Sequence, residues 1–410
     1  MFRYLIILIA VAVIPLSLPA REKNGGFRFT NNRQSVTIPA RVSNNLVVVP
    51  LRINNSPPLY FVLDTGVNTT LITEPILAYM LDLNMDELVY IFGLGGEGIL
   101  EAGRSTGNQI RIGSVRGDDM DLVILPEGVL SFSELFGFPV YGIIGYDLFR
   151  SFPIGIDYVR SQVSIFRNPN YRIPRRAEVV PFELIGTKPY VEARIKGADG
   201  ESVYARLMVD LGASHPVYLN EEFTPYSPSV TPSFLGMGIS GSLLGNLGRV
   251  KEIGIGDLRL DKPLVAYPDQ EFLTFFGEAI GWNGLIGGGV LSRYRVIFDY
   301  VSGHIVFREN YHARDSFDSN LSGMEVLASG QGFNEYVVKY VRPGSASYEA
   351  GILAGDQILS VNGKSHHSLR FYELNEELSG EEGRQIALTI DRDGKTLRKT
   401  IKLREDILFQ

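Results

Sequence analysis

The sequence predicts a mainly β protein in which one β fold occurs twice and is followed by a different C-terminal module. Three observations predict this. The 410 residues include 44 Gly, 23 Phe and 20 Tyr, a composition typical of strands joined by tight turns rather than of helical bundles. Short motifs recur in the same order at offsets of 142 to 146 residues. A segment near the C-terminus has no copy elsewhere in the chain.

The duplication is clearest where an apolar strand ends in Asp and is followed two residues later by Gly. Residues 61–67 (FVLDTGV) match residues 207–213 (LMVDLGA). Four further matches are 93–95 with 236–238, 110–113 with 253–256, 142–145 with 284–287, and 156–158 with 298–300. Five collinear matches at nearly one offset indicate an internal repeat. We therefore expect two copies of one fold at residues 27–170 and 176–314, joined by a loop at 167–174.

Within each copy the local pattern is mostly that of short strands. Residues 46–53 and 60–63 are rich in β-branched and aromatic side chains and are predicted strands. Pro50 lies inside the first of them, which favours an edge strand. Residues 75–83 are expected to form a short helix and residues 157–166 a further strand. Short strands at this spacing indicate a small barrel or sandwich.

The first 20 residues have the pattern of a secretory signal peptide. Arg3 provides the positive start, residues 4–14 are uniformly apolar, Pro15 ends that run, and Ala20 is a suitable cleavage site. The run is shorter than the ~20 residues that a transmembrane helix needs. We expect a signal peptide at 1–20 and export to the periplasm, the cell envelope or the medium. A retained N-terminal anchor is the alternative.

Composition excludes several classes of function. The chain has no Cys, which removes disulfides, thiolate metal sites and thiol nucleophiles. Its five His residues have no spacing typical of a metal site. The net charge of −7 argues against an extended nucleic-acid-binding surface. We therefore expect no metal, no cofactor and no nucleic-acid partner.

The two Asp-x-Gly motifs are the candidate chemical groups. Asp64 and Asp210 each end an apolar strand, where a charged side chain is costly unless it faces a functional site. Gly66 and Gly212 permit the turn that follows. If a pseudo-two-fold axis relates the copies, the two carboxyls face each other and share one proton. One can then activate a water while the other protonates a carbonyl. The alternative is that both Asp only cap turns.

These motifs resemble the paired signature of the pepsin/retropepsin-like aspartic proteases, in their bacterial exported form; the shared proton described above is itself a standard property of that family's dyad. The resemblance covers residues 35–310. It implies two retropepsin-like β-barrel lobes related by a pseudo-two-fold axis, with Asp64 and Asp210 as the catalytic pair. The residues implied to support their loops are Thr65, Gly66, Leu211 and Gly212, with the apolar stretch Gly142–Gly145 packed behind. The residues implied to form flaps over a peptide cleft are Gly93, Gly95, Gly96, Gly236 and Gly238.

The second copy departs from the family pattern. Leu211 stands where the family has Thr, so half of the implied hydroxyl brace between the two Asp loops is missing. Val67 also replaces a small or hydroxyl residue. A few hydrogen bonds of roughly 1 kcal/mol each are dispensable. The main hypothesis is an exported aspartic endopeptidase, and the alternative is a peptide-binding adaptor with a degenerate protease fold. Since one chain supplies both Asp, we expect a monomer.

The C-terminal module, residues 320–405, resembles a PDZ domain of the kind associated with bacterial proteases. The resemblance rests on residues 341–346 (VRPGSA) and 349–363 (EAGILAGDQILSVNG). It implies a groove beside a helix at 372–378 and a carboxylate-binding loop that includes Gly332 and Phe333. Such domains add a peptide strand to a sheet edge, so the expected ligand is a polypeptide C-terminus. A packing module without a ligand is the alternative.

Overall fold

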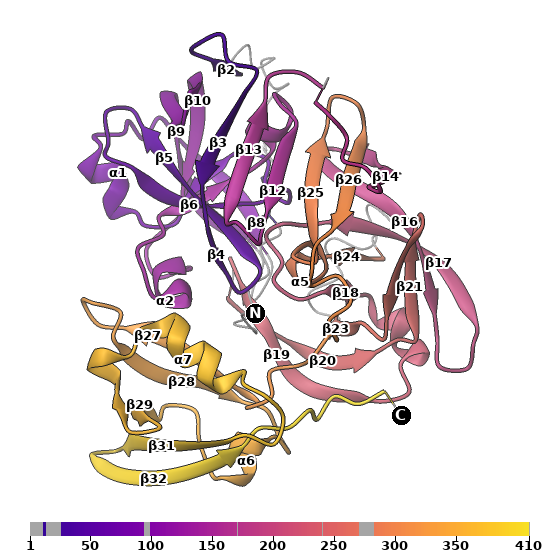
Figure 1. The fold of residues 1–410 in the computed structure, drawn as a ribbon. Coiled ribbons are helices and arrows are strands. Elements are labelled where there is room, and N and C mark those ends of the chain that lie inside the picture. Colours follow the sequence, from indigo (N-terminus) through magenta and orange to yellow (C-terminus); the bar gives the residue numbers. More distant parts are fainter. Residues whose placement is uncertain are drawn as a thin grey trace.

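The computed structural model describes residues 11–13, 26–93, 99–169, 171–239, 241–269 and 283–409. Two β lobes lie side by side, and a smaller domain of β-strands and short helices packs below them (Figure 1). The described residues are arranged in four sheets. None of the helices among these residues has the length and apolar character needed to cross a bilayer.

The N-terminal lobe is built on a ten-stranded sheet. Its strands in spatial order are β1 (Val11–Val13), β8 (Glu87–Gly93), β9 (Ile99–Ile112), β10 (Val115–Ile124), β7 (Thr70–Ile72), β11 (Gly142–Ile144), β6 (Leu59–Leu63), β5 (Leu46–Ile53) and β4 (Arg41–Ser43), with β2 (Phe27–Phe29) pairing with β10. Short helices connect them: α1 (Ile76–Met80), α2 (Phe132–Phe136) and α3 (Tyr146–Phe149). The helix expected at 75–83 is therefore present in shorter form.

The C-terminal lobe repeats this sheet. Its order is β19 (Val230–Gly238), β20 (Gly241–Arg249), β23 (Leu264–Pro268), β18 (Val217–Leu219), β24 (Gly284–Ile286), β17 (Ser202–Val209), β16 (Lys188–Lys196), β21 (Glu252–Ile255) and β22 (Leu258–Asp261), with β15 (Glu183–Ile185) pairing with β16. In each lobe a strand that precedes the Asp motif pairs in parallel with the strand of the Gly-x-x-Gly motif: β6 with β11 and β17 with β24. The lobe also contains the 3-10 helix η1 (Glu221–Tyr226) and α5 (Gly288–Leu291).

A six-stranded sheet joins the two lobes. Its order is β14 (Glu178–Pro181), β26 (His304–Glu309), β25 (Tyr294–Asp299), β12 (Ile154–Asp157), β13 (Gln162–Phe166) and β3 (Ser35–Pro39). The central β12–β25 pair comes from the repeated motif at 156–158 and 298–300. The single strand predicted at 157–166 is wrong, because a turn at residues 158–161 divides it into β12 and β13.

Pro50 does not mark an edge strand, contrary to the sequence-based expectation. β5 pairs with β6 along one side, and on its other side it pairs first with β4 and then with β9. The β4 pairing ends at Val48 and the β9 pairing begins at Arg52. Pro50 lies in the gap between these partners, where a residue without an N–H donor removes no ladder hydrogen bond.

The C-terminal domain has its own sheet, in the order β27 (Met324–Ser329), β28 (Glu335–Val341), β29 (Gln357–Val361), β31 (Gln385–Arg392) and β32 (Lys395–Lys402), with β30 (Lys364–Ser365) beside β29. Its helices are α6 (Ala346–Glu349), η3 (His366–Ser368) and α7 (Phe371–Leu378). Phe371, Leu374 and Leu378 of α7 are buried. Their i, i+3, i+7 spacing forms the apolar stripe by which a surface helix packs on a core.

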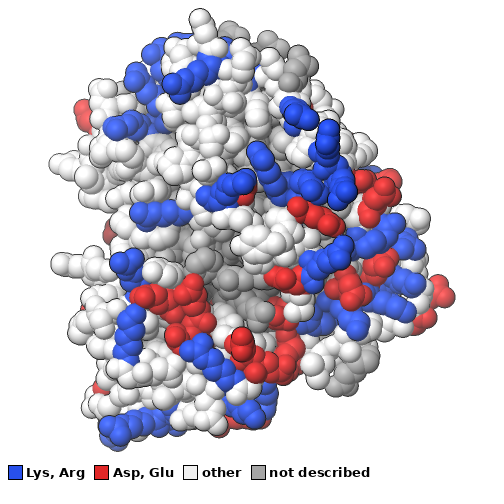
Figure 2. Space-filling model, viewed as in Figure 1, with Lys and Arg blue, Asp and Glu red and all other residues white. Residues whose placement is uncertain are grey.

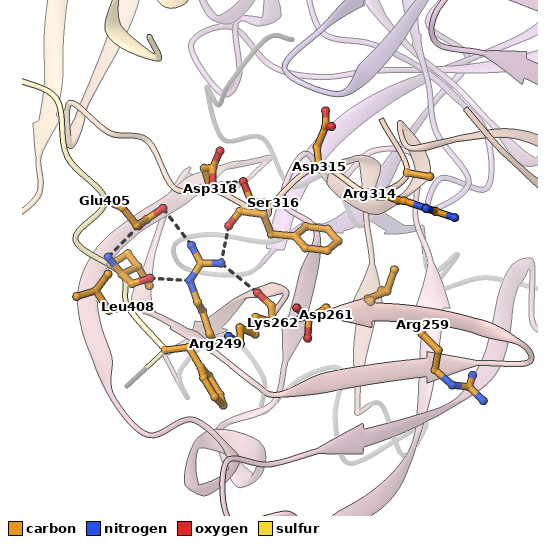
Figure 3. Close-up of a pocket in the computed structure, with 15 residues that line it drawn as sticks. Arg249, Arg259, Asp261, Lys262, Arg314, Asp315, Ser316, Asp318, Glu405 and Leu408 are labelled. Carbon is orange, nitrogen blue, oxygen red and sulfur yellow. Dashed lines mark hydrogen bonds and ion pairs between the residues drawn. The ribbon is translucent and has the colours of Figure 1, made fainter. Parts of the chain in front are cut away.

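A buried arginine fastens the C-terminal tail to the C-terminal lobe (Figure 3). The Arg249 guanidinium donates hydrogen bonds to the backbone carbonyls of Ile407, Lys262 and Phe317 and to the carboxylate of Glu405. The cavity of about 540 Å³ beside it is lined by the tail and by the segment that leads from the lobe into the C-terminal domain. Arg249 thus holds together three segments at the domain junction.

The predicted signal peptide lies almost entirely outside the described residues. Of residues 1–20, only 11–13 are described, as the strand β1 that pairs antiparallel with β8. The export prediction and the domain boundaries stay predictions.

Candidate active site

Asp64 sits at the first residue after β6, on a loop fixed by its own lobe. Its backbone N–H donates to the carbonyl of Ile144 at 2.9 Å, and its Oδ1 accepts a hydrogen bond from the N–H of Gly66 at 2.6 Å. The parallel β6–β11 pair therefore places the side chain, and the turn at Gly66 orients the carboxyl.

Asp210 is held in the same way in the second lobe. Its N–H donates to the carbonyl of Ile286 at 2.8 Å, and its Oδ1 accepts from the N–H of Gly212 at 2.9 Å. The repeated sequence motif thus has a repeated set of hydrogen bonds.

The structure brings the two Asp loops together at the lobe junction. A Cβ atom added to Gly212 would lie 2.3 Å from Oδ2 of Asp64, so the carboxyl of one lobe rests on the backbone of the other lobe's loop. Any larger residue at position 212 would displace Asp64. Asp64 and Asp210 are both fully buried, and each is close enough to influence the ionisation of the other.

One hydroxyl braces the two loops. The Oγ1 of Thr65 donates to the carbonyl of Val209 at 2.8 Å and accepts from the N–H of Leu211 at 3.0 Å. Leu211 is fully buried and has no hydroxyl with which to return these bonds. The brace is therefore one-sided, as the departure from the family pattern predicted.

A second pair of contacts encloses the loops from outside. The Nδ2 of Asn45, in the turn before β5, donates to the carbonyl of Ser214 at 3.2 Å. Reciprocally, the hydroxyl of Thr187, in the turn before β16, donates to the side-chain oxygen of Asn68. Each lobe thus uses the same turn to hold the Asp loop of the other lobe.

Glycines behind the loops are required by close backbone packing. A Cβ atom on Gly145 would lie 2.3 Å from the carbonyl oxygen of Asp64, and one on Gly287 would lie 2.3 Å from that of His215. At Gly142 the corresponding distance to the carbonyl oxygen of Leu71 is 1.9 Å. Only glycine allows the Gly-x-x-Gly strands to approach the loops this closely.

Burial and mutual repulsion set the charge of the pair. Burial, followed by the nearby charge of Asp210, raises the pKa of Asp64 well above its usual range. Burial also raises the pKa of Asp210, to about 6, while hydrogen bonds from Asp64 and Gly212 oppose that rise. The interaction between the two side chains raises the pKa of Asp64 and lowers that of Asp210, which is the behaviour of a carboxyl pair that shares one proton.

Sequence analysis missed one charged group at this site, Lys188. It is the first residue of β16, is buried, and its charge acts on both Asp64 and Asp210. Burial lowers the pKa of Lys188, and the two carboxyls oppose that effect. The repeat contained the signal: at an offset of 142, position 188 corresponds to Leu46. A cation in one copy at a position that is apolar in the other copy indicates a role specific to that copy.

The predicted flap glycines are partly described. Gly93 ends β8, whereas Gly95 and Gly96 lie outside the described residues. Gly236 and Gly238 lie in β19, where a register shift occurs between Phe234 and Gly236. Gly236 has φ 135°, a conformation that favours glycine. The hydroxyl of Tyr218 donates to the carbonyl of Leu235 at 3.0 Å, which links this hairpin to the strand beside the Asp210 loop.

The predicted peptide-binding residues of the C-terminal domain, Gly332 and Phe333, lie in the turn between β27 and β28. They line a cleft of about 830 Å³ between that domain and the N-terminal lobe. Arg41 of β4 borders this cleft, and its guanidinium lies over the rings of Tyr60 and Phe138 at 4.3 and 4.5 Å. Neither Asp64 nor Asp210 lines it. The cleft is therefore a separate surface from the carboxyl pair.

The comparisons with known families agree with this geometry. Residues 49–148 match the aspartyl protease family. Residues 337–392 match the PDZ domain family. The chain thus combines an aspartic-protease-like fold with a C-terminal PDZ domain, as the sequence predicted.

Two solved structures are similar to parts of this chain. An aspartic proteinase from Irpex lacteus is 10% identical with a TM-score of 0.43, and the match covers 68% of this chain and 99% of that one. A photosystem II D1 C-terminal processing protease is 27% identical over 20% of this chain and 22% of its own length, with a TM-score of 0.19. Neither similarity is strong enough to bear on function.

No group of three or more His, Asp or Glu side chains suited to a metal ion occurs among the described residues. The chemistry available at the site is that of two carboxyls with one shared proton and a neighbouring lysine.

Proposed function

We propose that this protein is an aspartic endopeptidase in which Asp64 and Asp210 activate a water for attack on a peptide carbonyl. The observation that carries the proposal is the meeting of two fully buried carboxyls from pseudo-symmetric loops, with raised pKa values and different proton affinities. General acid–base catalysis needs one ionised and one protonated group at the working pH.

The two carboxyls have distinct roles in this mechanism. Asp210, which ionises first, accepts a proton from the bound water as its oxygen attacks the carbonyl carbon. Asp64, which holds the shared proton, donates it to the carbonyl oxygen, and a tetrahedral intermediate forms. As the intermediate collapses and the C–N bond breaks, Asp210 gives the proton it took from water to the leaving amine. Asp64 takes back a proton from the hydroxyl that becomes part of the product carboxyl, which restores the pair. Lys188 favours the ionised form of the pair through its positive charge.

The site is closed in this structure because Asp64 and Asp210 have no exposed surface. A polypeptide substrate would therefore reach them only after the lobe junction opens. Such opening and closing is common in enzymes that exclude water from their chemistry. We further propose export as the route to the compartment where the enzyme acts, with the PDZ domain serving polypeptide recruitment.

The test compares cleavage of an unfolded, fluorescence-quenched protein substrate by wild type, Asp64→Asn and Asp210→Asn between pH 3 and 8. Asp261→Asn, at an exposed position of β22 in the C-terminal lobe, is the matched control. We expect kcat/KM of wild type to rise as Asp210 ionises near pH 6, and both dyad variants to lose at least 100-fold. An inactive wild type would support the peptide-binding adaptor suggested by Leu211. Dyad variants with wild-type rates would refute catalysis by Asp64 and Asp210.

A further inference from the structure

The PDZ sheet ends on one side in an edge strand. β27 is the last strand in its sheet and pairs only with β28. An exposed edge strand of this kind is where a PDZ domain adds a peptide strand. Yet Met324, Glu325, Val326 and Ala328 of β27 are all buried. Met324, Val326 and Ala328 pack into the core of the PDZ domain itself, so the element that covers the edge is identified by its own contacts with β27.

The element that covers this edge is α2 of the N-terminal lobe. α2 packs directly against β27, and Figure 1 shows it above β27 and α7. Phe132, Leu135 and Phe136 belong to one continuous buried cluster that also contains Met324, Val326 and Phe371 of the PDZ domain; the shared cluster crosses the domain boundary. The interface between α2 and the PDZ domain is thus a buried hydrophobic interface.

The closest approach is at the end of α2. Gly137 caps the helix in a left-handed conformation, with φ 69°. A Cβ atom on Gly137 would lie 2.5 Å from Cβ of Phe371, the first residue of α7. The Phe371 ring stacks on that of Tyr336 of β28 at 5.6 Å. No side chain fits between α2 and the PDZ domain at this point.

The loop that leads into β27 is also satisfied within the chain. The backbone N–H groups of Ser322 and Gly323 both donate to the side-chain oxygen of Asn320, and the N–H of Met324 donates to the hydroxyl of Ser322. Successive N–H groups in such a turn are suited to bind an anion. Here the side chains of Asn320 and Ser322 already accept hydrogen bonds from these N–H groups.

The charge of this face does not favour an acidic ligand at α7. Glu373, Glu376 and Glu377 lie on α7, and Figure 2 shows acidic side chains gathered over the PDZ domain in this region. The α2 segment carries a single charge, Glu134, and turns its apolar side chains Phe132, Leu135 and Phe136 into the cluster that it shares with the PDZ domain.

We propose that the peptide-binding edge of the PDZ domain, β27 with α7, is the docking site of α2 from the same chain, and that a polypeptide ligand binds there only in competition with α2. A tethered segment has an effective concentration in the millimolar range. A free ligand that binds this edge only weakly therefore cannot displace the docked α2.

The docked segment is connected to the Asp64 loop by a short stretch of chain. The hydroxyl of Ser133 in α2 donates to the carbonyl of Val140 and accepts from its N–H, at 3.2 and 3.1 Å. Two residues later β11 begins, and the carbonyl of Ile144 accepts the hydrogen bond from Asp64. Release of α2 thus disturbs the strand that positions Asp64, so occupancy of the PDZ edge and the setting of the Asp64 loop are coupled.

A pair of glycines in the same lobe tests the proposal. Gly137→Val inserts a side chain against Phe371, whereas Gly128→Val introduces the same strain at φ 79° with nothing within 4 Å of the new Cβ. Both changes are made with Asp64→Asn, so that the result does not depend on proteolysis. Gly137→Ala and Gly128→Ala are the milder pair should the valine variant at 137 fail to fold.

Amide hydrogen exchange of the full chain is the first readout. We expect Gly137→Val to speed exchange in residues 132–138, 324–329 and 142–146 at least tenfold, with β31 and β32 unchanged, and Gly128→Val to leave all of them at the reference rate. Equal exchange in the two variants, or faster exchange throughout the chain, would overturn the proposal.

The second readout is binding of a fluorescein-labelled peptide of residues 129–141, which carries the α2 side chains. We expect Gly137→Val to bind it at least tenfold more tightly than the reference chain and Gly128→Val. Equal affinity, or no binding by any of the three, would show that the edge is not a docking site in competition with α2.

Discussion

The one-sided brace between the two Asp loops gives the sharpest test of how the site is held. Thr65→Val keeps the shape of the side chain and removes only the hydroxyl. That hydroxyl makes two hydrogen bonds across the lobe junction, to the carbonyl of Val209 and from the N–H of Leu211, at 2.8 and 3.0 Å, and Thr65 is fully buried. The change leaves one carbonyl and one N–H without their partner.

The magnitude follows from those two groups. A buried polar group left without a partner costs ~1–3 kcal/mol, so the two together predict a loss of about 3 kcal/mol in the free energy of unfolding. For a domain of this size, that corresponds to a fall of roughly 6–12 °C in Tm. Thr65→Ser keeps the hydroxyl and loses only one buried methyl, for which we expect about 1 kcal/mol.

The assay is urea unfolding at pH 7, followed by tyrosine fluorescence and circular dichroism, with wild type and both variants measured side by side. A Thr65→Val variant within 1 kcal/mol of wild type, or one indistinguishable from Thr65→Ser, would show that the hydroxyl does not hold the loops together. Leu211→Thr supplies the reciprocal hydroxyl, and we expect it to raise or preserve turnover. A large loss would mean that the leucine itself is needed for packing.

Three further predictions concern charge. Lys188→Met removes the cation beside the carboxyls and should move the acid limb of the pH–rate profile upward by roughly one unit; an unmoved limb would show that its charge does not reach the pair. Because the folded-state pKa of Asp210 is about 6, above its value of ~3.9 in unfolded chains, its protonated form favours folding: the contribution is present below pH 4 and lost as pH rises through 6. Wild type should therefore lose roughly 2 kcal/mol relative to Asp210→Asn between pH 4 and 7, and parallel unfolding curves for the two proteins would contradict this. Arg249→Ala should cost about 3 kcal/mol in urea unfolding and speed exchange in residues 403–409, with Arg249→Lys intermediate; an unchanged tail would refute its role as an anchor.

The local sequence was sufficient to predict the repeat and the two Asp loops. Asp64 and Asp210 stand out because a charged side chain ends an apolar strand twice at one offset, and glycine is the only residue that tolerates the backbone packing at 142 and 145. The PDZ domain could also be predicted from the sequence, because its turn glycines have a fixed spacing. Such features depend on near neighbours in the chain, and so a single sequence contains them.

Contacts between distant residues could not be predicted in this way. The repeat marks Lys188 as a cation at the position where the first copy has Leu46, but its burial beside two carboxyls arises from the packing of the lobes. Pro50 was misassigned because only the sheet order shows that its neighbours change from β4 to β9.

The sequence by itself determined that this chain is two copies of an acid-bearing β lobe followed by a PDZ domain, since strand periodicity, turn residues and repeated motifs are local properties. The tertiary structure decided that one threonine braces both loops, that a lysine lies beside them, and that α2 covers the PDZ edge. Most of these relations join residues more than 100 positions apart, and only the packing of one surface against another brings them together.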